Sequence, residues 1–207
     1  MPSDSTPRAP LPYEAVLFDM DGTLVDTEGL WWEATVDVAA SLGRVLGPAD
    51  TPYVHGRTVE DTAAHLAPAA DQETVDAVAE RLTESFADRI RRGVRVIPGA
   101  AELLRALATE AVPTALVSAS PRSIVELVLP SLGHRFAVVV AAGETARGKP
   151  HPDPYLEAAR LLAADPRRCV AVEDSPTGIA AATAAGCRVL VVSPSAGLPD
   201  LRVMSLS

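Results

Sequence analysis

Residues 15–28 read AVLFDMDGTLVDTE, and this stretch decides the fold class that we predict for the chain. Its first four residues form an apolar run, and Asp19 and Asp21 follow that run one residue apart. Side chains at positions i and i+2 of a strand lie on the same face, so both carboxylates can point toward one centre at the strand's end. Gly22 then allows the backbone to turn sharply out of the sheet.

Two neighbouring carboxylates repel each other, and each resists ionisation beside the other. A divalent cation removes that repulsion, and a ligand set made only of oxygen atoms favours Mg²⁺. Asp19 and Asp21 therefore suggest a magnesium site. The alternative for this stretch taken alone is an ordinary turn, because Asp-Gly commonly ends a strand.

Four later runs are also rich in valine and apolar at successive positions, which is typical of strands buried on both faces of a parallel sheet. The helical patterns between them include three starts at which a capping residue precedes a proline, at 120–121, 153–154 and 175–176. Strands that alternate with helices predict an α/β fold with a doubly wound parallel sheet. The four runs are residues 114–119, 136–141, 169–173 and 189–193.

This alternation is interrupted after the first run, because about seventy residues before Val94 lack a convincing strand pattern. The interval predicts helices at about 27–42, 59–66 and 72–92, and Asp71 is the expected cap of the last one. We therefore expect a helical insert in the α/β core. The predicted units are a flexible leader at 1–12, a core at 13–26 and 95–207, and a helical cap at 27–94.

The composition excludes several classes of partner. The formal net charge of -9 argues against a surface for nucleic acid or anionic membrane, but it is compatible with a small anionic substrate held through a bound cation. No run is long enough to span a membrane, and no signal-peptide layout begins the chain. Cys169 and Cys187 lack metal-site spacing and are interpreted as reduced core residues. These features predict a cytoplasmic protein.

Further reactive side chains follow the later strand-like runs. Ser118 closes the second run, Lys149 follows the third, and Glu173 and Asp174 close the fourth. Each has an ordinary explanation when taken alone, as a helix-capping region, a surface charge or a turn. In a doubly wound sheet, however, all of them fall at the carboxyl edge, where such folds bind ligands. The set combines carboxylates for a cation with a hydroxyl and an ammonium for an anion.

The order and spacing of these segments resemble the four motifs of the haloacid dehalogenase superfamily of phosphotransferases. The matching pieces are DMDGTL at 19–24, the serine of LVSAS, the lysine of GKPHP and the EDS at 173–175. The resemblance extends from about residue 13 to 194. The helical insert resembles the cap found in relatives of phosphoglycolate phosphatase and β-phosphoglucomutase. Asp21 favours phosphate esters as substrates, because dehalogenases of this superfamily lack the second aspartate.

The resemblance implies a role for each core residue. Asp19 would be the nucleophile that forms an aspartyl-phosphate, and Asp21 would be the general acid and base. Ser118, the backbone amide of Ala119 and Lys149 would hold the transferring phosphoryl group. Mg²⁺ would be the cofactor. Its ligands would be an oxygen of Asp19, the carbonyl of Asp21 and Asp174, with Glu173 as a more distant or water-mediated member.

The segment HGRTVED at 55–61 resembles the cap loop that reaches the active site in this superfamily. His55, Gly56 and Arg57 are therefore candidate substrate contacts, together with Glu28, which lies with Thr27 at the expected hinge. An exposed loop residue is an equally good interpretation of His55.

Trp31 and Trp32 are consecutive in a predicted helix and therefore point about 100° apart. We expect at least one of them in the core of the cap and the other at the cleft. The cap loop also departs from the β-phosphoglucomutase pattern, since His55 and Val59 stand where that pattern has a lysine and an arginine. This departure favours hydrolysis over mutase action, although Arg57 and the SAS at 118–120 keep a mutase open.

The leading functional hypothesis is a Mg²⁺-dependent phosphomonoester hydrolase that acts on a small phosphorylated metabolite, such as a sugar phosphate. The first alternative is a β-phosphoglucomutase-like phosphosugar mutase. The second is a catalytically silent module that binds a metabolite. We expect neither nucleic acid nor membrane as a partner, and a monomer is compatible with the sequence.

Overall fold

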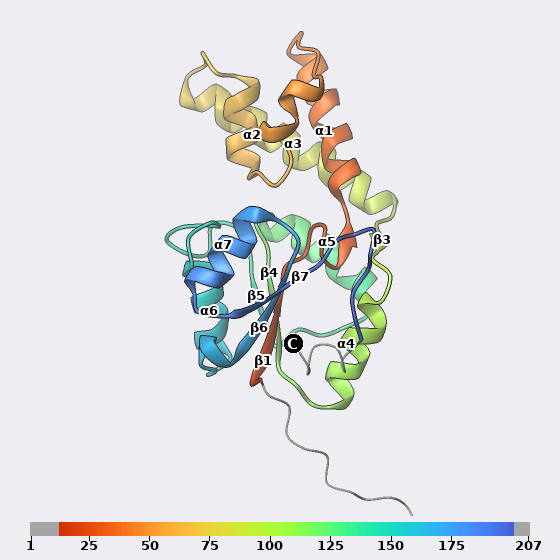
Figure 1. Cartoon of the computed structure of the whole chain (residues 1–207). Helices are drawn as coiled ribbons and strands as arrows, with labels where there is room; N and C mark the ends of the chain where they lie inside the picture. The colour runs from red at the N-terminus through yellow and green to blue at the C-terminus, as the bar shows by residue number, and fades with distance from the viewer. Residues whose placement is uncertain (1–12, 201–207) are drawn as a thin grey trace, which may run out of the picture.

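A five-stranded parallel sheet forms the core of the protein, in the strand order β5-β4-β1-β6-β7 (Figure 1). The computed structural model describes residues 13–200. The predicted α/β fold with a parallel sheet is confirmed, and the first apolar run forms its central strand. The strands are β1 (Ala15–Phe18), β4 (Thr114–Val117), β5 (Val138–Val140), β6 (Cys169–Glu173) and β7 (Arg188–Val191).

Alternate residues of β1 enter two separate hydrophobic cores. Val16 and Phe18 pack with side chains of α4 and α5, whereas Ala15 and Leu17 pack with side chains of α6 and α7. Both faces of the strand are therefore buried, which explains why its sequence is apolar at every position. The helices that cover the two faces are α4 (Ala100–Thr109), α5 (Arg122–Leu132), α6 (Asp153–Leu161) and α7 (Pro176–Ala184).

A layer of helices lies beyond the carboxyl ends of the strands, at the top of Figure 1. It contains α1 (Glu28–Ser41), the 3₁₀ helix η1 (Pro48–Tyr53), α2 (Val59–Leu66) and α3 (Gln72–Arg92). α3 packs against both α1 and α2, and it also contacts α5 of the core. The three helices expected in this interval all form, and the Asp71 side chain caps α3 by accepting from the Thr74 amide.

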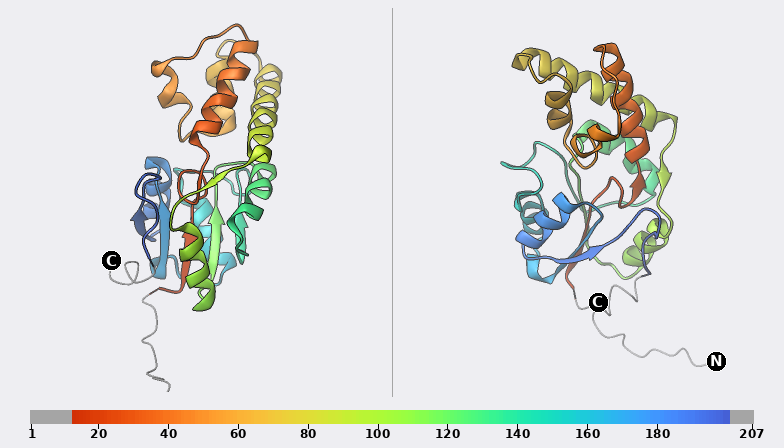
Figure 2. Two further views of the ribbon diagram at one scale, coloured as in Figure 1. Left: turned by 90° about the vertical axis from the view of Figure 1, so that its right-hand side faces the viewer. Right: turned by 45° about the horizontal axis from the view of Figure 1, so that its top comes forward.

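Two short strands connect this helical layer to the core, as both views of Figure 2 show. β2 (Val25–Asp26) pairs antiparallel with β3 (Arg95–Val96), and an ion pair between Asp26 and Arg95 links them. The expectation that no strand follows β1 before Val94 is therefore wrong at β2. Two residues are too few to show an alternating pattern, and the partner strand lies far along the sequence.

Three helices were predicted to start with a capping residue directly before a proline, and only one of these starts is correct. Ser175 caps α7 and accepts from the Gly178 amide. α5 begins after Pro121 and α6 begins at Asp153 itself, so Ser120 and Asp153 do not cap them. Both side chains have other partners, since Ser120 bonds to Asp21 and Asp153 pairs with Arg147.

The predicted leader at residues 1–12 lies outside the described residues. Cys169 and Cys187 are buried and free. Among residues 13–200, no helix is both long enough and apolar enough to cross a membrane.

Candidate active site

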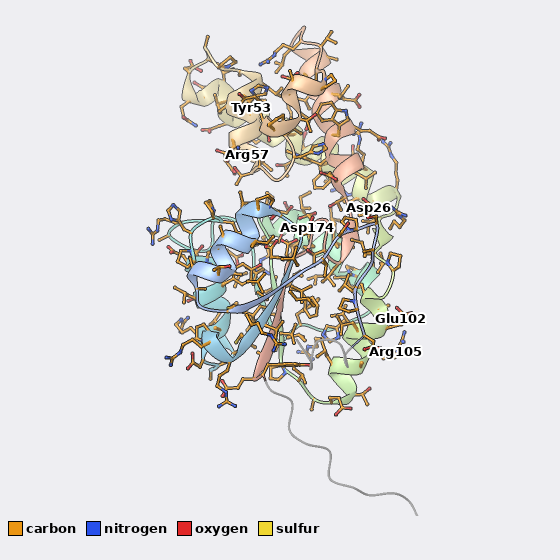
Figure 3. All side chains as sticks on the ribbon, viewed as in Figure 1. Asp26, Tyr53, Arg57, Glu102, Arg105 and Asp174 are labelled. Atoms are coloured by element: carbon orange, nitrogen blue, oxygen red, sulfur yellow. The ribbon has the colours of Figure 1, made fainter. Side chains whose placement is uncertain are left out.

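A cavity of about 280 Å³ lies where the carboxyl edge of the sheet faces the layer of helices at residues 27–94. Figure 3 shows Asp174 at the edge of the core and Arg57 opposite it, in the loop before α2. The core contributes residues from four separate strand ends, and the helical layer contributes residues from α1, α2, α3 and the loop before α2. The lining residues are Asp19, Asp21, Gly22, Thr27, Glu28, Trp31, His55, Gly56, Arg57, Val59, Phe86, Ala119, Ser120, Lys149, Asp174, Ser175, Pro176 and Thr177.

The Lys149 ammonium lies between two carboxylates that come from different strands. Its Nζ is 2.6 Å from Asp19 Oδ1 and 2.6 Å from Glu173 Oε1, and its side chain is only 5% exposed. Burial alone would lower the pKa of Lys149, but the charges of Asp19 and Glu173 raise this pKa well above its usual value. The ammonium therefore stays charged and neutralises part of a strongly acidic site.

Lys149 is also the only lysine among the 18 lysine and arginine residues of the chain. An ammonium is a compact point charge, whereas a guanidinium is a wide planar fork. A site that holds one cation between two carboxylate oxygens suits the smaller group.

Both carboxylate oxygens of Glu173 are engaged by protein donors. Oε1 accepts from Lys149 Nζ and from the Tyr155 hydroxyl at 2.7 Å, while Oε2 accepts from the amides of Asp174 and Ser175 and from the Ser175 hydroxyl. Glu173 is fully buried and does not line the cavity. Its contacts make it a counter-charge for Lys149 and leave Asp19 and Asp174 facing the cavity.

One carboxylate oxygen from each of Asp19, Glu173 and Asp174 lies within 4.8 Å of the other two. Asp19 Oδ2 is buried and has no hydrogen-bond partner among residues 13–200. Burial and Glu173 raise the pKa of Asp19 well above its usual value, and the same causes raise the pKa of Asp174 to about 6. An unpaired carboxylate oxygen among crowded acids fits a divalent cation with oxygen ligands.

Three hydroxyl groups fix the Asp21 carboxylate. Thr27 donates to Oδ1 at 2.7 Å, and Ser120 and Ser118 donate to Oδ2 at 2.8 and 3.2 Å. Ser118 also accepts from the Ser120 amide and does not line the cavity, whereas Ala119 and Ser120 do. The structure thus brings Asp21 to the same cavity as Asp19 and places Ser120, rather than Ser118, at its surface.

The candidate cap residues also reach the cavity. Glu28, the first residue of α1, pairs with His55 Nδ1 at 2.6 Å. Arg57 lines the cavity, and its Nε donates to the Pro52 carbonyl. Gly56 lies between them in the same loop.

The expectation that at least one tryptophan is in the core of the helical insert is confirmed by Trp31, but the other tryptophan, Trp32, does not line the cleft. Trp31 is buried against Phe86, donates to the Val54 carbonyl and also lines the cavity. Trp32 does not line the cavity, and it contacts the His55 ring edge-to-face. Trp31 therefore belongs both to the core of the helical layer and to the wall of the cleft.

Sequence reasoning missed several residues that hold the reactive groups in place. Tyr155 contacts Glu173, Thr23 donates to Asp174 at 3.2 Å, and Thr27 contacts Asp21. The only sequence signal for Tyr155 was its place in GKPHPDPY, six residues after Lys149. Its partner is on another strand, so its role was not visible locally.

Gly22 provides the first test of this geometry. Its φ is +83°, and a Cβ at this position would overlap the Asp174 carboxylate. We expect Gly22→Ala to displace Asp174 and to weaken magnesium affinity by about 10- to 100-fold, the cost seen when a ligand's support is lost. Titration of Mg²⁺ by calorimetry would measure the effect.

Gly43 is the matched control for this substitution. Its φ is +73°, but a Cβ there would meet no atom within 4 Å. Gly43→Ala therefore carries the same backbone strain without the carboxylate overlap, and we expect it to leave magnesium affinity unchanged. Equal affinities in the two variants would show that Gly22 does not support the acidic cluster.

Comparison with known proteins places this geometry in context. A family model described as haloacid dehalogenase-like hydrolase matches residues 16–192. The chain is 33% identical over 197 residues to hexitol phosphatase A of Escherichia coli K12, covering 92% of this chain and 88% of that protein. It is 35% identical over 219 residues to hexitol phosphatase B of the same strain, covering 98% and 96%. The crystal structure of CbbY from Rhodobacter sphaeroides in complex with phosphate matches with a TM-score of 0.79 at 29% identity, covering 87% of this chain and 86% of that one.

Proposed function

This chain belongs to the haloacid dehalogenase-like hydrolases and is one of their phosphatases, and from this premise we propose that it is a Mg²⁺-dependent phosphomonoester hydrolase. It acts on a small phosphorylated metabolite through an aspartyl-phosphate on Asp19. The observation that carries the proposal is the contact of 2.6 Å between Lys149 Nζ and Asp19 Oδ1, with Asp21 at the same cavity. These contacts support the proposal, because the reaction needs a nucleophile, a cation and an acid around one reacting centre.

In the first half-reaction, a carboxylate oxygen of Asp19 forms a bond to phosphorus while the ester P–O bond breaks. The electron pair of the broken bond leaves with the alcohol oxygen, and Asp21 donates the proton that this oxygen requires. The hydroxyls of Thr27 and Ser120 hold the two oxygens of Asp21, so its orientation is set before the substrate binds.

In the second half-reaction, Asp21 accepts a proton from a water molecule whose oxygen attacks the phosphorus. The bond from phosphorus to Asp19 breaks, which restores the Asp19 carboxylate and releases inorganic phosphate. Asp21 is protonated again and ready for the next leaving group.

Charge is the main obstacle when a carboxylate attacks a phosphate. The Lys149 ammonium, already in contact with Asp19, stabilises the negative oxygens of the transferring group. Asp19, Asp174 and the Asp21 carbonyl would hold Mg²⁺, which when bound neutralises further phosphoryl charge. Ala119 and Ser120 line the cavity. The amide of Ala119 would donate to a phosphoryl oxygen, whereas the Ser120 hydroxyl already donates to Asp21.

The substrate class follows from the cavity and from the relatives. A volume of about 280 Å³ is near the lower end of small-molecule sites, which span roughly 300–1,000 Å³. The two curated relatives described above are hexitol phosphatases. We therefore propose a sugar or polyol monophosphate as the substrate.

We expect the purified protein to release inorganic phosphate from such esters only when Mg²⁺ is present. The panel is sorbitol 6-phosphate, glucose 6-phosphate, phosphoglycolate and a nucleoside monophosphate, followed by a colorimetric phosphate assay. EDTA should stop the release and excess Mg²⁺ should restore it. Among the described core residues that line the cavity, Lys149 is the only cation, so the acidic site needs a metal ion to balance its charge. Undiminished phosphate release in EDTA would contradict the proposal.

The same panel separates the alternatives. A phosphosugar mutase would isomerise a hexose 1-phosphate in a reaction that depends on a bisphosphate primer and would release little phosphate. A catalytically silent module would bind a metabolite without turnover of any ester. Neither result is expected if Asp21 activates water efficiently.

A further inference from the structure

Tyr155 is a buried tyrosine of α6 that contacts both charges behind the reacting centre. Its hydroxyl donates to Glu173 Oε1 at 2.7 Å, and Lys149 Nζ lies 5.2 Å from the centre of its ring. We propose that Tyr155 is a positioning residue for phosphoryl transfer, acting through Glu173 to keep the Lys149 ammonium on Asp19. This inference rests on the proposed function.

Glu173 Oε1 accepts from two donors at once. The Tyr155 hydroxyl at 2.7 Å and the Lys149 ammonium at 2.6 Å share this one oxygen. A hydrogen bond from a neutral hydroxyl disperses part of the carboxylate charge. Glu173 therefore attracts Lys149 less strongly than it would alone, and the ammonium remains available to Asp19 and to the phosphoryl oxygens.

The other side of Glu173 leaves it no freedom to compensate. Oε2 accepts from two amides and the Ser175 hydroxyl. A Cβ at Gly178 would overlap the Glu173 carboxylate, so α7 closes that side of the group. Because Glu173 is held on that side, the loss of the Tyr155 hydroxyl acts on the other group that Oε1 binds, the Lys149 ammonium.

Tyr155→Phe tests the hydroxyl alone, because the phenylalanine ring keeps its volume and its contact with the ammonium. Without the hydroxyl, the full charge of Oε1 holds Lys149 and draws it away from the phosphoryl group. We expect kcat to fall about tenfold, the factor for losing one hydrogen bond to a charged group, with KM changed less than twofold. Inhibition by orthovanadate, which adopts the five-coordinate geometry of the transferring group, should weaken by the same factor as kcat.

Tyr13→Phe is the matched control. Tyr13 is also a buried tyrosine, but it precedes β1 and so lies at the opposite edge of the sheet from the site. Rates are normalised to the folded fraction, and thermal unfolding is recorded for both variants. A lowered unfolding temperature with unchanged kcat and vanadate inhibition in Tyr155→Phe would overturn the proposal, as would a variant that fails to fold, since either assigns the hydroxyl to stability alone.

Two outcomes separate this inference from the proposed function. An active wild-type protein whose kcat survives Tyr155→Phe unchanged would overturn only the role of Tyr155. If the wild-type protein shows no turnover, the proposed function fails, and calorimetric binding of vanadate in Mg²⁺ still compares the wild type with the variant. A tenfold weaker binding in the variant would then support the positioning role, and equal binding or no binding to either protein would overturn it.

Discussion

Asp19→Asn is expected to abolish phosphate release, lowering kcat by about 10⁴-fold or more, while leaving the folded protein at least as stable as the wild type. The amide has almost the same shape as the carboxylate, but its oxygen is a poor nucleophile and cannot form the acyl phosphate. Removing the nucleophile of a covalent mechanism costs more than removing any group that only assists it.

The stability part of this expectation follows from the crowding of acids. One carboxylate oxygen from each of Asp19, Glu173 and Asp174 lies within 4.8 Å of the other two. The neighbouring ammonium is that of Lys149, which contacts Asp19. The pKa of Asp19 is raised well above its usual value, first by burial and then by Glu173, so ionised Asp19 destabilises the fold as the pH rises. A neutral asparagine removes this cost in metal-free buffer at neutral pH.

Phosphate release and thermal unfolding of the same preparation would check both parts. Asp88→Asn is a suitable control, because Asp88 is an exposed residue of α3 that forms an ion pair with exposed Arg91. We expect this control to leave both activity and stability near wild type. Substantial turnover by Asp19→Asn would rule out Asp19 as the nucleophile.

Lys149→Met is expected to lower both activity and stability. Loss of a preorganised cation at the transferring group should reduce kcat by about 10²–10³-fold. The substitution also leaves Asp19 and Glu173 buried without their counter-charge, and breaking a buried pair in this way costs about 3–5 kcal/mol. Its effect on stability is therefore opposite in sign to that of Asp19→Asn.

Chemical denaturation and steady-state kinetics would measure this second expectation. The control is Arg91→Met, which removes an exposed ion pair with Asp88 and should cost no more than about 1 kcal/mol. Lys149→Arg should retain more stability than Lys149→Met, because it keeps the charge, but its wider group fits the two oxygens poorly. A Lys149→Met protein as stable as the wild type would show that the two carboxylates are not ionised together in the fold.

Local pattern was sufficient for the regular elements of this fold. The apolar run at β1 and the helix at α3 follow from residue type and spacing, since burial on both faces or a cap at Asp71 leaves a local signature. The two-residue strands β2 and β3 left none, because each exists only through its pairing with the other. The start of α5 was misplaced for a similar reason, as Ser120 bonds to a distant aspartate instead of capping its helix.

The sequence by itself determined which chemical groups the site contains. Asp19, Asp21, Lys149 and Asp174 follow strand-like runs, and parallel strands bring their carboxyl ends to one edge whatever the details of packing. Tertiary structure alone decided how those groups are paired: which oxygens of Glu173 are occupied, that Tyr155 supports them, and that Ser120 faces the cavity. Such pairings depend on distances of a few ångströms between segments far apart in the chain, and no local pattern of residue types encodes those distances.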